Sequence, residues 1–187
     1  MRTLEELLKH DIDVKINTVV MAGKNTQDIL PLVAFTNAFP VSVRFIEEMP
    51  FNGDGHNYSG IEWDYIRILE EIKSAYPDIK KIGDAANSTA YHYSINNHQG
   101  NIGVIAAYSR TFCGTCNRIR LTPEGTLKTC LYGDGKLNIK DQMRLGMDDA
   151  ELKNSLLSVF SNREKNGWDA ESNRLESPYE SMASIGG

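Results

Sequence analysis

The chain has 187 residues, of which 41% are hydrophobic and 24% are charged, and its formal net charge is −5. This composition is typical of a globular protein of one to one and a half domains. No apolar run approaches the about 18 residues that a membrane-spanning helix needs, and no apolar signal segment follows Met1, so we expect a cytoplasmic protein without a membrane partner. An acidic chain without a basic tract also speaks against a nucleic-acid partner.

The first fifty residues alternate between helical and strand patterns. Apolar spacing predicts helices over residues 3–10 and 26–37, and β-branched apolar runs predict strands over residues 14–21 and 41–49. The resulting β–α–β pattern is typical of a parallel α/β sheet. Two parallel strands do not form a stable sheet alone, so we expect the chain to begin partway through a larger α/β domain whose first strands are missing.

The remainder of the chain reads as a mixed α+β region with antiparallel strands. A polar, glycine-rich loop over residues 50–60 marks the change. Further along the chain, the patterns predict in order a helix over 62–75, a strand pair over 89–95 and 102–109, a hairpin over 118–131 with a turn at Pro123–Gly125, and helices over 139–145 and 148–162 before a polar tail.

The three cysteines of the chain all lie within 18 residues, which indicates a metal site. Cys113 and Cys116 form a C-x-x-C, and Cys130 follows after 13 residues on the far arm of the predicted hairpin. A four-iron cluster tolerates three thiolates and then keeps one iron without a protein ligand. Zinc needs a fourth ligand, and neither His92 nor His98 has finger-like spacing to a cysteine. An iron–sulfur site is favoured, zinc is second, and unliganded buried thiols are third.

Cations surround the cysteines in the sequence. Arg118 and Arg120 are two residues apart, so in a strand their side chains share one face. Two neighbouring guanidinium groups repel each other unless an anion or a carboxylate lies between them. An anion site and a solvated, salt-bridged strand face both fit this spacing, and Arg110 and Lys128 add to the local positive charge.

Several segments together resemble a known family. Residues 112–122 (FCGTCNRIRLT), with Gly125 and the pair Cys130-Leu131, closely resemble the C-terminal cluster segment of the GTP 3′,8-cyclase family of molybdenum cofactor biosynthesis. Residues 14–20 (VKINTVV) and 43–50 (VRFIEEMP) are similar to the last strands of that family's incomplete radical-SAM barrel, and the chain ends in a similar Gly-Gly.

The resemblance covers the C-terminal half of a family member. It implies that residues 1–50 are the last βα units of a partial TIM-type barrel and that residues 51–187 are the cluster and GTP-binding region with its Gly-Gly tail. The family's N-terminal C-x₃-C-x₂-C, which holds the cluster that cleaves S-adenosylmethionine, is absent from the 187 residues. We therefore expect this chain alone to be inactive, and no catalytic residue is assigned in it.

The resemblance also implies the chemistry. In the family, a 5′-deoxyadenosyl radical removes hydrogen from C3′ of GTP, and the product is 3′,8-cyclo-7,8-dihydro-GTP, which passes to cyclic pyranopterin monophosphate synthase. Cys113, Cys116 and Cys130 match the ligands of a second [4Fe–4S] cluster whose open iron binds the guanine. By the same resemblance, GTP contacts are expected at Lys15, Arg44, Arg118, Ile119 and Arg120, an S-adenosylmethionine contact at Met49, and an active-site tail at Gly186 and Gly187.

Each of these residues also has a plainer interpretation. Lys15 and Arg44 lie on adjacent predicted strands, where either is also consistent with a buried cation paired with Glu47 or Glu48. Met49 is also compatible with core packing, and a Gly-Gly end with a frayed terminus. The histidines at 10, 56, 92 and 98 are interpreted as surface or structural residues.

Two other functions remain alternatives. One is a radical-SAM maturase with an auxiliary cluster that acts on a peptide, although such proteins usually carry more cysteines. The other is a non-enzymatic zinc-ribbon interaction module, which leaves the Gly-Gly tail unexplained. An exposed barrel edge would invite pairing of two copies, so a homodimer is also among the expected partners.

Overall fold

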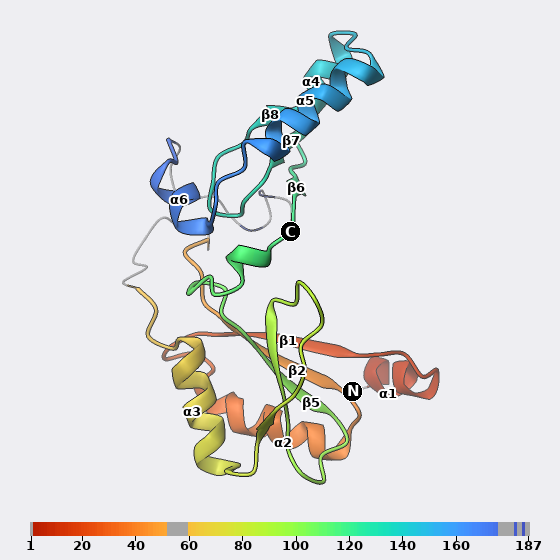
Figure 1. The fold of residues 1–187 in the computed structure, drawn as a ribbon. Helices are drawn as coiled ribbons and strands as arrows, with labels where there is room; N and C mark the ends of the chain where they lie inside the picture. Colours follow the sequence, from red (N-terminus) through yellow and green to blue (C-terminus); the bar gives the residue numbers. More distant parts are fainter. Residues whose placement is uncertain (1, 52–59, 176–181, 183–184, 186–187) are drawn as a thin grey trace. The chain divides into compact units, whose positions relative to one another are not determined.

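The structure is a computed structural model that describes residues 2–51, 60–175, 182 and 185 (Figure 1). It divides into two compact units. Unit 1 contains Met1–Met49 and Gly60–Phe112, and unit 2 contains Pro50–Ser59 and Cys113–Gly187. The boundary at residue 50 between a barrel portion and a cluster region stays a prediction.

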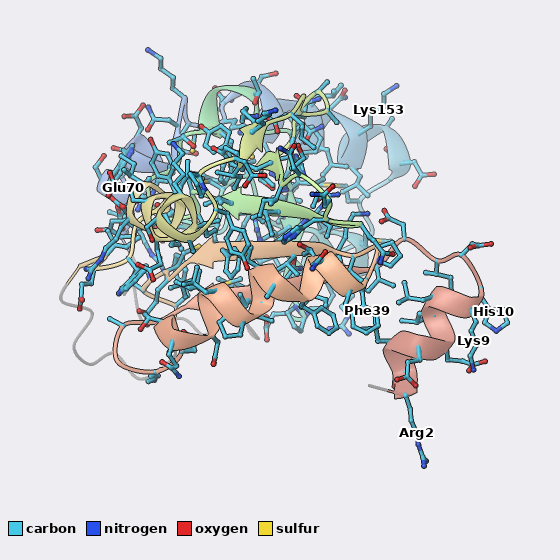
Figure 2. The ribbon with its side chains drawn as sticks, turned by 90° about the horizontal axis from the view of Figure 1, so that it is seen from below. Arg2, Lys9, His10, Phe39, Glu70 and Lys153 are labelled. Atoms are coloured by element: carbon cyan, nitrogen blue, oxygen red, sulfur yellow. The ribbon has the colours of Figure 1, made fainter. Side chains whose placement is uncertain are left out.

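Unit 1 confirms the helices and strands expected in its part of the chain and adds one short strand. Its elements are α1 (Arg2–Lys9), β1 (Lys15–Val20), η1 (Thr26–Asp28), α2 (Ile29–Ala38), β2 (Ser42–Glu47), α3 (Tyr65–Ala75), β3 (Lys80–Lys81), β4 (Ala90–Ser94) and β5 (Asn101–Ile105). Helix α3 begins later than expected because Asp64 caps it, accepting a 2.8 Å hydrogen bond from the Arg67 backbone N–H. Figure 2 shows the side chains of Arg2 and Lys9 of α1, and of His10 just after it, pointing outward.

The strands of unit 1 form one sheet in the order β1-β2-β5-β4-β3. Strands β1, β2 and β5 are parallel, whereas β4 and β3 are antiparallel to their neighbours. The sequence patterns identify two of these three parallel strands. Strand β5 pairs parallel to β2, with Phe45 opposite Val104, so the later strand pair belongs to the same sheet. That further strands precede this chain stays a prediction. The fold is a mixed α/β fold, and a barrel remains a prediction.

One face of this sheet carries the core of unit 1. Helices α2 and α3 both contact β2 and β5 (Figure 1), and their apolar side chains pack on alternate strand residues. The buried members from the helices and the central strands are Ile29, Val33, Ile68, Ile72, Val43, Phe45, Ile102 and Val104. Since successive strand residues point to opposite faces, the residues between them define a second, more polar face.

Unit 2 contains a three-stranded antiparallel sheet, in the order β6-β7-β8, followed by helices. Its elements are η2 (Cys113–Thr115), β6 (Arg120–Leu121), β7 (Thr126–Lys128), β8 (Leu137–Asn138), α4 (Ile139–Arg144), α5 (Asp149–Ser161) and α6 (Gly167–Ser172). The hairpin and the helices α4 and α5 are confirmed. Strand β8 and helix α6 were not expected, because two and six residues are too few for a hydrophobic period to show.

The hairpin turn has the expected chemistry. Gly125 adopts a left-handed φ of 88° and donates a 2.9 Å hydrogen bond to the Thr122 carbonyl. A three-residue loop with a left-handed glycine matches the twist of the two strands it joins. As for membranes, the described part of the chain contains no helix with the length and apolar character needed to cross a bilayer.

Candidate functional site

The three cysteines lie at the start of unit 2 and beside its hairpin. Cys113 is the first residue of the short helix η2 and Cys116 follows its last, and the Cys116 backbone N–H donates to the Cys113 carbonyl at 3.2 Å. Cys130 follows β7 by two residues. All three are free thiols of intermediate burial. Burial raises the pKa of Cys130, and the charges of Cys113 and Cys116 raise it further, so the three sulfurs lie within electrostatic reach of one another.

Hydrogen-bond donors surround the sulfur atoms. The backbone N–H groups of Tyr132 and Gly133 donate to Cys130, and the N–H of Arg118 donates to Cys116. Burial raises the pKa of Cys116, but the Arg118 N–H and the side chain of Arg163 together outweigh burial and bring that pKa below its ordinary value. Donors of this kind stabilise thiolates bound to iron–sulfur clusters.

Arg163 was missed by sequence reasoning. Its guanidinium hydrogen-bonds to the Cys116 sulfur, although it follows helix α5, far from the cysteines in the chain. No spacing rule connects two such distant positions, so only the tertiary structure identifies Arg163 as a neighbour of the cysteine cluster.

The donor set is compatible with an iron–sulfur cluster. Within residues 2–51 and 60–175, no three His, Cys, Asp or Glu side chains are grouped so that they could hold one metal ion. The thiolates of a cubane cluster each bind a different iron, and N–H donors at two of the three sulfurs agree with the chemistry of such a cluster.

The two predicted arginines lie beside these sulfurs. Burial lowers the pKa of Arg120, the charges of Cys130 and Cys116 oppose this, and the charge of Arg118 lowers it again. The structure thus brings both guanidinium groups close to each other and to the thiols. Arg120 has no ion pair with any described residue, so the salt-bridged alternative finds no support there.

Two neighbours of Arg120 complete this part of unit 2. Ile119 is 53% exposed, and Lys128, which lies opposite Arg120 in the hairpin, is 2% exposed. The exposed aliphatic side chain of Ile119 therefore lies between two half-buried arginines in the sequence, whereas Lys128 is buried.

A second group of predicted residues lies on the polar face of the unit 1 sheet. Lys15 and Asn17 alternate on β1, and Asn17 pairs in register with Arg44 of β2. Paired residues of adjacent strands share a face, so the three side chains form one polar row. The Asp13 carboxylate joins this row: a hydrogen bond and ion pair from Lys15 lowers its pKa, and the charge of Arg44 contributes in the same direction.

The interpretation of Lys15 or Arg44 as a cation paired with Glu47 was wrong. Glu47 instead accepts hydrogen bonds from the Tyr65 N–H and from Ser109, and Lys15 pairs with Asp13. Arg44 has neither a hydrogen bond nor an ion pair with the residues that the structure describes, and its Nε is buried without a partner. A buried guanidinium N–H without an acceptor can donate its hydrogen bond to a bound anion.

The remaining predicted positions are only partly described. Met49 follows β2 by two residues and is half-buried. Gly186, Gly187 and His56 lie outside the described residues. The other histidines have structural or surface contacts: His98 bonds Thr36 at 2.8 Å, His92 bonds Asp84 at 3.1 Å, and His10 lies 3.5 Å from Glu6.

Comparison with known proteins finds a family model and several relatives that all belong to molybdenum cofactor biosynthesis. The family model described as Molybdenum Cofactor Synthesis C matches residues 41–168. Molybdenum cofactor biosynthesis protein 1 of Mus musculus is 41% identical over 139 residues, which cover 74% of this chain and 22% of that protein. GTP 3′,8-cyclase of Clostridium perfringens strain SM101 is 36% identical over 168 residues, which cover 89% of this chain and 51% of that protein.

A plant protein shows the same relation. Mitochondrial GTP 3′,8-cyclase of Arabidopsis thaliana is 36% identical over 140 residues, which cover 75% of this chain and 36% of that protein. The chain thus spans about half or less of the length of these curated relatives.

Proposed function

Because the chain belongs to the Molybdenum Cofactor Synthesis C family, we propose that it is the C-terminal, substrate-binding part of a GTP 3′,8-cyclase. The complete protein converts GTP to 3′,8-cyclo-7,8-dihydro-GTP by radical-SAM chemistry during molybdenum cofactor biosynthesis. The observation that carries this proposal is the cysteine cluster itself. Three free thiols within electrostatic reach, two of them beside donors, adjoin two arginines that lie close together.

Cys113, Cys116 and Cys130 would hold a [4Fe–4S] cluster. Such a group supplies one iron without a protein ligand, which is open to the guanine base. The protein's own contribution is to fix the thiolates through backbone N–H donors and to place positive charge beside them. Arg118 and Arg120 then bind GTP with charge-assisted hydrogen bonds, and Ile119 lies along the nucleotide.

Lys15 and Arg44 are assigned to the triphosphate, which carries about four negative charges. The missing partner of the Arg44 Nε and the surface position of Lys15 support this assignment. The carboxylate of Asp13 pairs with the Lys15 ammonium group. A triphosphate would compete with this single exposed carboxylate.

The rest of the proposal concerns the complete protein. Residues 1–50 would belong to a partial radical-SAM barrel, with Met49 against S-adenosylmethionine and the Gly186-Gly187 tail in the active site. The 187 residues contain no C-x₃-C-x₂-C, so this chain alone makes no product. Association as a homodimer and transfer of the product to cyclic pyranopterin monophosphate synthase remain predictions.

The proposal is tested by anaerobic reconstitution of the 187-residue chain. We expect about four irons per chain, a broad absorption band in the blue part of the visible spectrum, and binding of GTP in preference to a peptide. Arg118→Ala and Arg120→Ala should each weaken GTP binding without lowering the iron content. Arg144→Ala, which changes an exposed arginine of α4, is the matched control and should leave both quantities unchanged.

Two results would reject the proposal. Tight binding of one zinc with no iron would favour an interaction module, and preference for a peptide over GTP would favour a different radical-SAM maturase.

A further inference from the structure

Gly103 occupies an unusual position in unit 1. It lies in the middle of strand β5, is buried, and pairs with Arg44 of β2 on one side and with His92 of β4 on the other. Its φ is not in the left-handed region, so the backbone conformation itself does not require glycine. Glycine weakens the interior of a strand, and where it persists it often marks the close approach of another group.

The group that approaches Gly103 is the side chain of Arg44. A Cβ atom built on Gly103 would lie 2.9 Å from Cγ and 3.7 Å from Cβ of Arg44, and 3.5 Å from Cβ of Ala90. The first distance is too short for two carbon atoms. The contact is with the stem of the arginine, which cannot move aside as easily as the end of a flexible side chain. Any side chain at position 103 would therefore displace Arg44 from its path across the sheet.

The path of the Arg44 side chain determines where its guanidinium charge lies on the polar face of the sheet. The side chain leans over β5 on the polar face that also carries Lys15 and Asn17, and its buried Nε has no partner among the described residues. A guanidinium restricted by packing loses less conformational entropy when it binds an anion than a freely rotating one does. The missing side chain of Gly103 thus leaves room for the stem of Arg44, whose Nε has no hydrogen-bond partner among the described residues.

We propose that Gly103 is a positioning residue for nucleotide binding: it leaves room for the Arg44 stem, and Arg44 thereby presents its guanidinium to the triphosphate. This inference rests on the proposed function. It concerns the phosphate chain alone, because the guanine base is assigned to the cluster held by the three cysteines.

The test compares two ligands that differ only in the phosphates. GTP and guanosine are titrated into the reconstituted 187-residue chain and into its Gly103→Ala variant. We expect Gly103→Ala to weaken GTP binding about tenfold, comparable with the loss of one charge-assisted contact, and to leave guanosine binding unchanged. Gly83→Ala is the matched control, since no atom lies within 4 Å of the position of its Cβ, and it should bind both ligands normally.

A double-mutant cycle with Arg44→Ala completes the test. Removing the arginine stem makes room for the methyl group, so Gly103→Ala should have no further effect on GTP binding in that background.

The outcomes are distinguishable. Equal GTP affinity of the wild type and Gly103→Ala would overturn the inference and leave the proposed function intact, whereas a wild-type chain with no affinity for GTP would overturn both. Parallel loss of GTP and guanosine affinity, or a full additional loss in the Arg44→Ala background, would show general damage to the sheet and would also overturn the inference.

Discussion

Glu47 accepts two hydrogen bonds from Ser109, one from the backbone N–H and one from the hydroxyl, each at 2.7 Å, although 62 residues separate the two positions. The same carboxylate accepts the backbone N–H of Tyr65, the first residue of α3, at 2.7 Å. Glu47 is fully buried at the end of β2. One carboxylate therefore fastens the end of a strand to the start of a helix and to the segment that precedes Cys113.

Glu47→Gln should destabilise the chain by about 1–3 kcal/mol, because an amide in this place turns its NH₂ group toward at least one of the three donors and leaves it unsatisfied. The measurement is equilibrium unfolding in urea. Glu70→Gln is the control, since Glu70 points outward from α3 (Figure 2), and it should change stability by less than about 0.5 kcal/mol. Equal stability of the two variants would show that the Glu47 contacts contribute nothing.

Gly125→Ala should destabilise unit 2 more than Gly146→Ala. Both glycines have a φ of 88°, which costs a residue with a side chain about 1–2 kcal/mol. A Cβ at Gly125 would additionally overlap the Cβ of Lys140, whereas no atom lies within 4 Å of the same position at Gly146. Thermal unfolding of the two variants separates backbone strain from steric overlap, and equal losses would show that the hairpin and α4 do not approach so closely.

Asp84 should stabilise the edge of the unit 1 sheet in a pH-dependent way. Burial raises the pKa of Asp84, but hydrogen bonds from Lys81 and from the backbone and ring of His92 outweigh burial, so that pKa lies below its ordinary value. A carboxyl group with a lowered pKa in the folded state contributes stability above its unfolded pKa of about 4, and this contribution is lost as the pH falls through the lower folded value.

Asp84→Asn removes that contribution. The variant should therefore be less stable than the wild type at neutral pH, and the difference should shrink as the pH is lowered below about 4. Unfolding free energies measured between neutral and acidic pH check this expectation. If the difference in unfolding free energy stays constant with pH, the charge of Asp84 does not contribute, and the side chain acts only through its packing.

The cysteines of the iron-free chain should differ in reactivity. The pKa of Cys130 is raised by burial and by the neighbouring thiols, whereas the pKa of Cys116 is lowered by hydrogen bonds that outweigh its burial. Because the thiolate is the reactive form, iodoacetamide near neutral pH should modify Cys116 before Cys130. Arg163→Ala should slow modification of Cys116, and Arg144→Ala should not. Mass spectrometry of the alkylated peptides gives the order, and faster modification of Cys130 would contradict the arrangement.

Local sequence patterns predicted much of this fold. The β-branched apolar run around Ile16 and the helical spacing around Ile68 were sufficient, because the residue types within each element reflect which of its faces is buried. The pairing of β5 with β2 was not predicted, since parallel pairing joins segments distant in the chain and leaves no local signal.

The site divides in the same way. The spacing of Cys113, Cys116 and Cys130 predicted a metal centre from the sequence, because ligands on one hairpin are close in the chain, and that centre stays a prediction. Arg163 and Gly103 stayed hidden, because their importance depends on a sulfur and an arginine stem that only tertiary structure brings next to them.

Binding of guanine at an iron left free by Cys113, Cys116 and Cys130 is tested most directly by electron-nuclear double resonance on the reduced, reconstituted chain with ¹⁵N-labelled GTP. A nitrogen hyperfine coupling from the labelled base, replaced by the ¹⁴N pattern with unlabelled GTP, is the predicted result. Bound GTP with no nitrogen coupling, or a metal whose every coordination position is filled by the protein, would contradict it.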